Sequence, residues 1–292
     1  MSAIADREVY NMFNLIKMNL YKLFHQKAFY IVPVIAAFIC CLMVYLIWSL
    51  PRLENQYSQE NVEPGFHMGI VAGSPETDAL PLVVKFNLTE FMDEIFGSGI
   101  LIILTSIVAA ITANAERKNG FIKNLAGQIA PRGMLAVTKL PGMLLESFLI
   151  LALSFAGCAL SGRLLYSDFT PGDMSALTKA IAVQLLLSFA LCAFILMICT
   201  LSENAAAGII TGIVLSTGIL PLLYTLINKI LWNYLHVPES FDITRYTLSG
   251  HLMSVSSTSE PDALGLALAV GTSYLAACSL GAFVILKKKD IA

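Results

Sequence analysis

Apolar segments long enough to cross a lipid bilayer dominate this 292-residue sequence and limit what it can fold into. A helix of about 20 residues, rising about 1.5 Å per residue, spans the hydrocarbon core of a membrane. Glu146 is the only charged residue within the apolar windows. These windows cover residues 29–50, 95–113, 140–160, 180–201, 205–227 and 263–286. The pattern predicts an all-α membrane protein with six transmembrane helices.

The overall composition supports a membrane protein. Mean hydropathy is +0.75 and only 13% of residues are charged, whereas about a quarter are charged in an average soluble domain. The six cysteines all lie inside apolar windows and form neither a CxxC motif nor a Cys/His cluster, so we expect no disulfide and no metal site. They are Cys40, Cys41, Cys158, Cys192, Cys199 and Cys278.

The distribution of basic residues predicts the orientation of the chain. Twelve of the 18 Lys and Arg residues lie in three segments that six crossings would place on one side. These segments contain Arg7, Lys17, Lys22, Lys27, Arg117, Lys118, Lys123, Arg132, Lys139, Lys287, Lys288 and Lys289. By the positive-inside rule, this side and both termini are cytoplasmic. We expect a multi-pass protein of the cytoplasmic membrane.

Three further helical segments accompany the predicted spans. Residues 9–27 repeat apolar side chains at helical spacing, which predicts an amphipathic helix lying in the inner membrane interface and joined to the first span by a bend. The stretch LTEFMDEIFGSG, residues 88–99, predicts a short amphipathic helix before the second span. Trp232 and Tyr234, in the long connection before the last span, favour the headgroup level and indicate a re-entrant-like extracellular segment.

Missing motifs argue against an enzyme. The sequence has no GxxxxGK[ST] loop, and no glycine is followed by lysine, so this chain has no phosphate-binding loop for ATP. HExxH and GxSxG are also absent, which argues against an intramembrane protease or lipase. We expect a non-catalytic subunit that binds no cofactor or metal itself.

Glu146, about two turns inside the third span, admits two interpretations. A charge at the centre of a membrane costs roughly 2.5–3.5 kcal/mol on insertion scales, and less near the interface. The carboxyl group either contacts a substrate or a proton in the bundle interior, or serves as a structural group that is protonated or bonded to a neighbouring helix.

Small and hydroxyl residues in two other spans are also ambiguous. Gly208 and Gly212 in GIITG lie on one helix face, where they allow close packing either within the chain or against a second subunit. Thr105, Ser106 and Thr112 either line a polar path or bond to their own helix backbone.

The second connection, residues 114–133, carries a short predicted helix with a narrow apolar edge. Phe121, Leu125 and Ile129 are spaced four apart, Gly120 can begin the turn and Pro131 ends it. This edge either rests on the inner membrane surface or inserts into the groove of a partner protein.

The order of these elements resembles the type-2 permeases of ATP-binding-cassette transporters over essentially the whole chain. The most specific part is ERKNGFIKNLAGQIAPRGMLAVTKL, in which Glu116, Gly120, Pro131, Arg132 and Lys139 are similar to the family pattern. Two positions depart from it: Phe121 stands where many members have Thr, and Gly127 interrupts the helix body.

The resemblance implies a permease dimer, homomeric or heteromeric, with two cytoplasmic ATPase subunits that hold ATP and magnesium. Residues 114–133 would then form the coupling loop, whose helix sits in a cleft of each ATPase. The expected ATPase-coupling residues are Glu116, Arg117, Gly120, Phe121, Lys123, Asn124, Leu125, Ile129, Pro131 and Arg132. Glu146 is the expected intramembrane polar residue.

The sequence and the resemblance together predict an exporter subunit that moves an amphipathic or hydrophobic cargo, such as an antimicrobial peptide, a drug or a lipid. Membrane lipid is the other expected partner, and no feature indicates nucleic acid. The alternatives are a proton-coupled secondary transporter using Glu146 and a permease-like subunit with a sensory or structural role.

Overall fold

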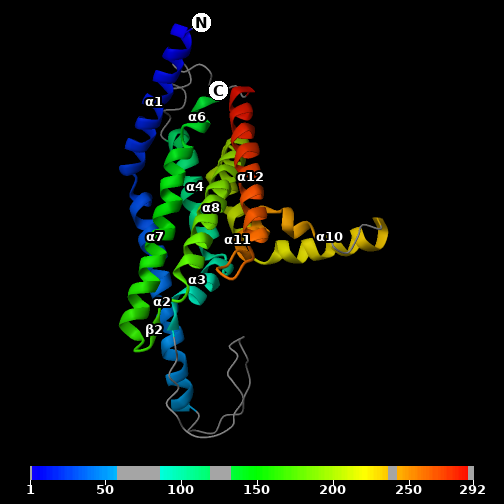
Figure 1. The fold of residues 1–292 in the computed structure, drawn as a ribbon. Coiled ribbons are helices and arrows are strands. Elements are labelled where there is room, and N and C mark those ends of the chain that lie inside the picture. Colours follow the sequence, from blue (N-terminus) through cyan, green and yellow to red (C-terminus); the bar gives the residue numbers. More distant parts are fainter. Residues whose placement is uncertain (1, 58–85, 119–132, 236–241, 289–292) are drawn as a thin grey trace.

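The computed structural model describes residues 2–57, 86–118, 133–235 and 242–288. Figure 1 shows an elongated bundle of helices from which one helix projects sideways. The helices are α1 (Ser2–Phe24), α2 (Lys27–Tyr57), α3 (Leu88–Gly97), α4 (Ile100–Lys118), α6 (Met134–Val137), α7 (Leu140–Leu165), α8 (Met174–Ser202), α9 (Ala205–Ser216), α10 (Ile219–Leu235), the 3-10 helix η1 (Ile243–Tyr246), α11 (Leu248–Ser254) and α12 (Pro261–Lys288). Strands β1 (Phe86–Asn87) and β2 (Phe169–Thr170) form one short parallel pair in register Phe86↔Phe169.

The described residues confirm an all-α protein with several helices able to cross a membrane. Four candidate spans are long and apolar enough: 27–49 in α2, 134–165 in α6 and α7, and all of α8 and α12. Two further pairs, α3 with α4 and α9 with α10, qualify only if each bent pair counts as one span. The described residues therefore contain four to six candidate spans, and the predicted windows 95–113 and 205–227 are not continuous helices.

Both interruptions have a local cause in the sequence. The α3–α4 pair bends by 57° at Ser98 and Gly99, where Gly99 adopts a positive φ of 74° that side-chain-bearing residues rarely occupy. The α9–α10 pair bends by 64° after Thr217, whose φ and ψ are not helical. The predicted helix at 88–99 is confirmed as α3, and the Asn87 side chain caps it by accepting a hydrogen bond from the Thr89 backbone N–H at 3.1 Å.

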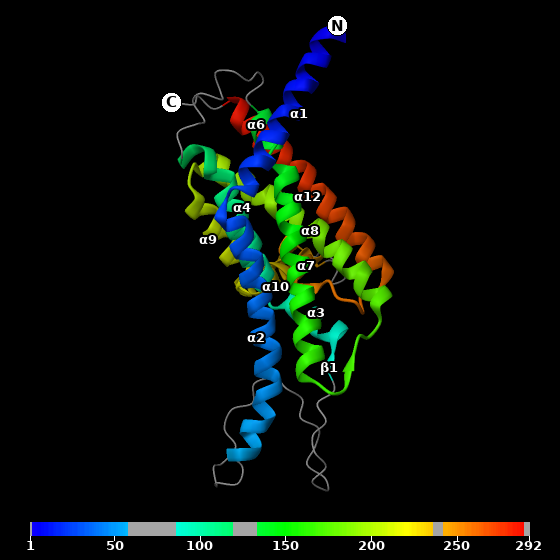
Figure 2. The same cartoon turned by 90° about the vertical axis from the view of Figure 1, so that its left-hand side faces the viewer.

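The two bent pairs pack against each other, with α4 beside α9 (Figure 2). A β-carbon on Gly99 would lie 2.7 Å from the carbonyl oxygen of Ser216, and one on Gly212 would collide with Ser106. A β-carbon on Gly208 would collide with the sulfur of Cys199 in α8. The GIITG glycines therefore pack within the chain, as one of the two interpretations predicted.

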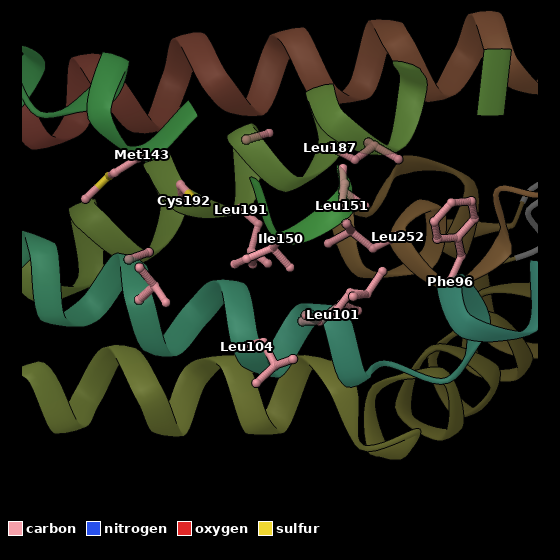
Figure 3. Packing of buried hydrophobic residues seen from close by; sticks show 14 of the residues in the cluster. Phe96, Leu101, Leu104, Met143, Ile150, Leu151, Leu187, Leu191, Cys192 and Leu252 are labelled. Carbon is pink, nitrogen blue, oxygen red and sulfur yellow. The ribbon is translucent and has the colours of Figure 1, made fainter. Parts of the chain in front are cut away.

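Helix α8 lies at the centre of the bundle, packed against α4, α7 and α12. Its composition is apolar around the whole helix, as expected for a helix buried on every side. Figure 3 shows side chains from several helices meeting in one core. They are Phe96, Leu101, Leu104, Met143, Ile150, Leu151, Leu187, Leu191, Cys192 and Leu252.

Helix α10 has the reverse of the usual amphipathic arrangement. Leu222, Leu226 and Ile230 point outward and are more than half exposed, whereas the amide of Asn228 is buried and bonded to Asp242 at 2.7 Å. An apolar outer face suits a helix surrounded by lipid. The bent α9–α10 pair is compatible with either a broken span or a re-entrant segment, and the part of the predicted segment at 236–241 lies outside the described residues.

Helix α1 exceeds the predicted segment 9–27, beginning at Ser2 and ending at Phe24. Figures 1 and 2 show it rising steeply along the bundle after a short break before α2. The helix packs on the bundle at its C-terminal end, where Leu23 is buried beside Gly142 of α7, whereas Phe13 and Tyr21 are exposed. The flat placement in the inner membrane interface stays a prediction from the sequence.

Candidate functional site

The ends of the second connection are held together by charged side chains. Glu116 lies near the end of α4 and Lys139 at the start of α7, and their carboxylate and ammonium groups are 3.2 Å apart. Lys22 of α1 reaches the other carboxylate oxygen at 3.4 Å. We call Lys22, Glu116 and Lys139 the loop-end cluster. It joins both ends of the chain segment 119–132 to the N-terminal helix.

Because the cluster is largely buried, the loss of one of its charges costs more stability than it would in a surface ion pair. The side chains of Glu116 and Lys139 are only 6% and 10% exposed, and that of Lys22 is 33% exposed. Lys139 also donates a hydrogen bond to the carbonyl oxygen of Ala113 at 2.8 Å. Removing one partner of a buried ion pair typically costs roughly 3–5 kcal/mol, because the remaining charge is uncompensated. The buried charges of Glu116 and Lys139 therefore stabilise each other in the folded protein.

Neighbouring contacts attach the same end of the bundle to other helices. The amide of Asn19 in α1 donates to the hydroxyl of Thr138 at 3.0 Å. Gly133 lies so close to Phe283 of α12 that a β-carbon would be 2.7 Å from its carbonyl oxygen. Helices α1, α4, α6, α7 and α12 therefore meet around the two ends of the connection.

A small cavity beside the cluster is too tight for a ligand. It has a volume of about 20 Å³ and is lined by Ala113, Glu116, Leu135, Ala136, Lys139, Leu196, Cys199, Thr200 and Leu286. A single water molecule already requires about 10–15 Å³ measured in this way. Among the described residues, the charged groups at this end make contacts between helices.

Most of the predicted coupling residues lie in the segment 119–132, outside the described ranges. Glu116 lies in the loop-end cluster, and Arg117 belongs to α4, with its side chain outside the described set. The remaining residues lie outside the described ranges, so the coupling helix itself stays a prediction. They are Gly120, Phe121, Lys123, Asn124, Leu125, Ile129, Pro131 and Arg132.

Sequence reasoning identified two members of the cluster by pattern and missed the third. Glu116 and Lys139 both belong to the family-like motif, but their ion pair was not predicted. Lys22 was counted only as a basic residue, because a contact across 94 sequence positions leaves no local signal. Its position only seven residues before Phe29, where the first predicted span begins, was the only hint of a place near the end of that span.

Glu146 is buried between α7 and α4, with 2% of its surface exposed. Thr112 donates a hydrogen bond to its Oε1 atom at 2.8 Å, so the hydroxyl of this threonine bonds a neighbouring helix. Oε2 has no partner among the described residues. The contact supports the structural interpretation, whereas the unpartnered oxygen leaves room for a proton or a cargo group.

The six cysteines form no disulfide bond within the described residues, and Cys199 lines the small cavity beside the loop-end cluster. Among the described residues, no group of three or more His, Cys, Asp or Glu side chains is arranged to hold a metal ion. No protein-family model matches the chain, and no curated protein is significantly similar to it. Its function must therefore be argued from the sequence and the structure.

Proposed function

We propose that this protein is the permease subunit of an ATP-binding-cassette exporter, driven by ATP hydrolysis in a separate cytoplasmic ATPase. The observation that carries the proposal is the loop-end cluster. It fixes both ends of the connection that resembles a coupling loop, with Glu116 on one side and Lys139 on the other. A segment anchored in this way can transmit a push to two helices at once.

The packing of α4 and α7 supports this mechanism. Lys139 bonds both Glu116 and the backbone of Ala113, so a force on residues 119–132 would move the ends of α4 and α7 together. Helix α4 packs along α9 and α8, which extends the movement toward the bent α9–α10 pair. The energy must come from a partner, since the sequence has no phosphate-binding loop.

The proposed assembly is a permease dimer, of identical or different subunits, with two ATPase copies in the cytoplasmic membrane. An amphipathic or hydrophobic cargo is consistent with the exposed apolar residues of α2 and α12, such as Phe38 and Leu280. The cargo class extends to antimicrobial peptides, drugs and lipids.

The decisive experiment is purification of the complex with the ATPase encoded beside this chain, followed by measurement of ATP hydrolysis and cargo efflux in proteoliposomes. We expect the ATPase to co-purify and its activity to respond to the permease. The substitutions Phe121→Ala and Leu125→Ala should abolish efflux while ATP hydrolysis continues. Leu164→Ala, at an exposed apolar position of α7, is the matched control and should leave efflux intact.

Other outcomes would favour the remaining hypotheses. Efflux that persists without any ATPase would overturn the proposal and indicate a secondary transporter. An ATPase partner without measurable efflux of any cargo would favour a sensory or structural subunit. If both loop variants keep efflux coupled to ATP hydrolysis, the alternative interpretation applies, in which the apolar edge of the loop rests on the inner membrane surface.

A proton-coupled transporter is the second candidate because of one observation, the buried and unpartnered Oε2 of Glu146. Glu146→Gln keeps the shape of the side chain and its bond from Thr112 but cannot exchange a proton. In a proton-driven carrier this variant should lose the dependence of transport on the pH gradient. If transport by the variant still depends on the pH gradient, Glu146 has a structural role only.

A further inference from the structure

A polar cavity opens at the end of α12 that lies opposite the loop-end cluster. Figure 1 shows α11 and the beginning of α12 beside the start of α10, a full helix length away from Lys288. The cavity has a volume of about 450 Å³. It is lined by Asp242, Thr244, Arg245, His251, Ser254, Val255, Ser259, Glu260, Asp262, Ala263 and Leu266. We call it the cap cavity.

The charges around the cap cavity are unbalanced. Three carboxylates, those of Asp242, Glu260 and Asp262, face a single guanidinium group, that of Arg245. Within the described ranges, neither Glu260 nor Asp262 forms an ion pair, and both side chains are exposed. The cavity therefore presents an excess of negative charge to whatever enters it.

His251 adds a directed acceptor to this wall. The residue is only 7% exposed, and its Nε2 atom lies 2.7 Å from the carbonyl oxygen of Arg245. A carbonyl oxygen can only accept, so Nε2 carries the proton and Nδ1 of the neutral ring is an acceptor. Nδ1 has no hydrogen-bond partner among the described residues. His251 lines the cavity, and the neutral form of a ring fixed in this way carries a lone pair on Nδ1.

The cavity walls are held in place before any ligand binds. Asp242 accepts hydrogen bonds from the side chain of Asn228 at 2.7 Å and from the backbone of Thr244 at 2.9 Å. The loop that carries Ser259 is fixed to α3, since the hydroxyl and the backbone N–H of Ser257 both donate to Asp93. Preorganised walls reduce the ordering cost of binding.

The volume of the cavity and the separation of its carboxylates indicate which kind of cation fits it. A divalent metal requires several oxygen ligands at about 2.0–2.6 Å around one point, and no such cluster exists in the described part of the chain. The cavity instead lies within the roughly 300–1,000 Å³ range of sites for small organic ligands. Its described lining is rich in carboxylates and hydroxyls and contains no Phe, Tyr or Trp side chain, so charge and hydrogen bonds dominate recognition.

We propose that the cap cavity binds a small organic polycation, whose ammonium groups contact Glu260 and Asp262 while one N–H donates to Nδ1 of His251. Charge-assisted hydrogen bonds of this kind are roughly twice as strong as neutral ones. This site is separate from the loop-end cluster, and binding to it requires no ATPase. Its test is therefore independent of the proposed function.

The experiment is isothermal titration of the full chain in nanodiscs of zwitterionic lipid with spermidine, a linear polyamine, as the probe. We expect saturable binding that weakens as salt is raised from 50 to 500 mM, values chosen because the screening length falls below about 10 Å above 0.1 M. Glu260→Gln and Asp262→Asn should each weaken binding about threefold to tenfold. Both side chains are exposed, so the fold should tolerate the changes.

Two further variants sharpen the test. Glu94→Gln removes a carboxylate from an exposed position on α3, outside the cavity, and should leave the affinity unchanged. His251→Gln can keep a donor toward Arg245 while it removes the ring acceptor, and should weaken binding about threefold. The proposal is overturned if spermidine does not bind, or if Glu260→Gln and Glu94→Gln change the affinity equally.

Discussion

The two ends of the bundle use charged residues in opposite ways. At one end, Glu116 is buried and lies within 3.4 Å of two lysine ammonium groups. At the other end, Glu260 and Asp262 are exposed at the cap cavity and form no ion pair within the described ranges. A buried, paired carboxylate holds helices together, whereas an open, unpaired one is available to a ligand.

This difference follows from solvation. An exposed carboxylate is stabilised by water and costs the fold little, so it needs no internal partner. A buried one must recover its lost hydration through close counterions and hydrogen bonds. Substitutions at the loop end should therefore affect stability, and those at the cap cavity should affect binding.

The largest effect is expected from Glu116→Gln, which leaves Lys139 buried without its counterion. We expect the free energy of unfolding to fall by roughly 3 kcal/mol, at the lower end of values for broken buried pairs because Lys22 is partly exposed. Reversible denaturation in mixed micelles measures this change. Glu94→Gln is the matched control and should change stability by less than about 0.5 kcal/mol. Equal effects would remove the contrast between the two ends.

A double substitution tests whether the loss comes from the uncompensated charge. Glu116→Gln combined with Lys139→Met removes the negative charge and the most buried positive charge together. Stability should recover by about 1–2 kcal/mol relative to the sum of the two single substitutions, as for residues in direct contact. Strictly additive losses would mean that Glu116 and Lys139 act independently.

Lys22→Met should have a smaller effect, because the lysine side chain is one-third exposed and water screens its attraction to Glu116. We expect a loss of about 1 kcal/mol or less in the same denaturation assay. Efflux activity provides a second measurement, since α1 would lose one of its links to the loop. A loss as large as that of Glu116→Gln would place Lys22, and not Lys139, as the main counterion.

The sequence predicts most of the helices but not their bends. Composition alone marks the apolar windows, and the helices α2, α7, α8 and α12 follow from them. Gly99 allows the break through its positive φ, but it also lies close to Ser216, a residue more than a hundred positions away that no local pattern indicates. Likewise, Gly218 at the α9–α10 break has a positive φ of 34°, but small residues that permit a bend also permit a straight, closely packed helix.

The candidate sites show the same limit. The family-like motif contains both Glu116 and Lys139. The contact of Lys22 with Glu116, in contrast, depends on how α1 packs against the bundle. The cap cavity was not predicted at all. Its acidic residues lie in stretches of sequence that look like ordinary polar loops. They line one cavity only because η1, α11 and the start of α12 fold close together.

The smallest predicted effect concerns Asp242, which belongs to the cap cavity but is bonded like a structural group. Burial alone would raise its pKa, but the hydrogen bonds from Thr244 and Asn228 and the nearby charge of Arg245 outweigh this and lower the pKa below the ordinary 3.8. A carboxyl with a depressed pKa in the folded state stabilises the fold above its ordinary pKa. That contribution is lost as the pH falls through the lowered value.

Denaturation of the parent chain and of Asp242→Asn between pH 6 and pH 3, a range that brackets the ordinary Asp pKa of about 3.9, measures this contribution. The parent should lose stability toward acid more steeply than the variant. The variant should also bind spermidine more weakly, since it removes one of the three cavity carboxylates. Identical acid profiles would mean that ionised Asp242 stabilises the fold no more than an exposed carboxylate such as Glu260 does. All three carboxylates of the cap cavity would then serve binding and not stability.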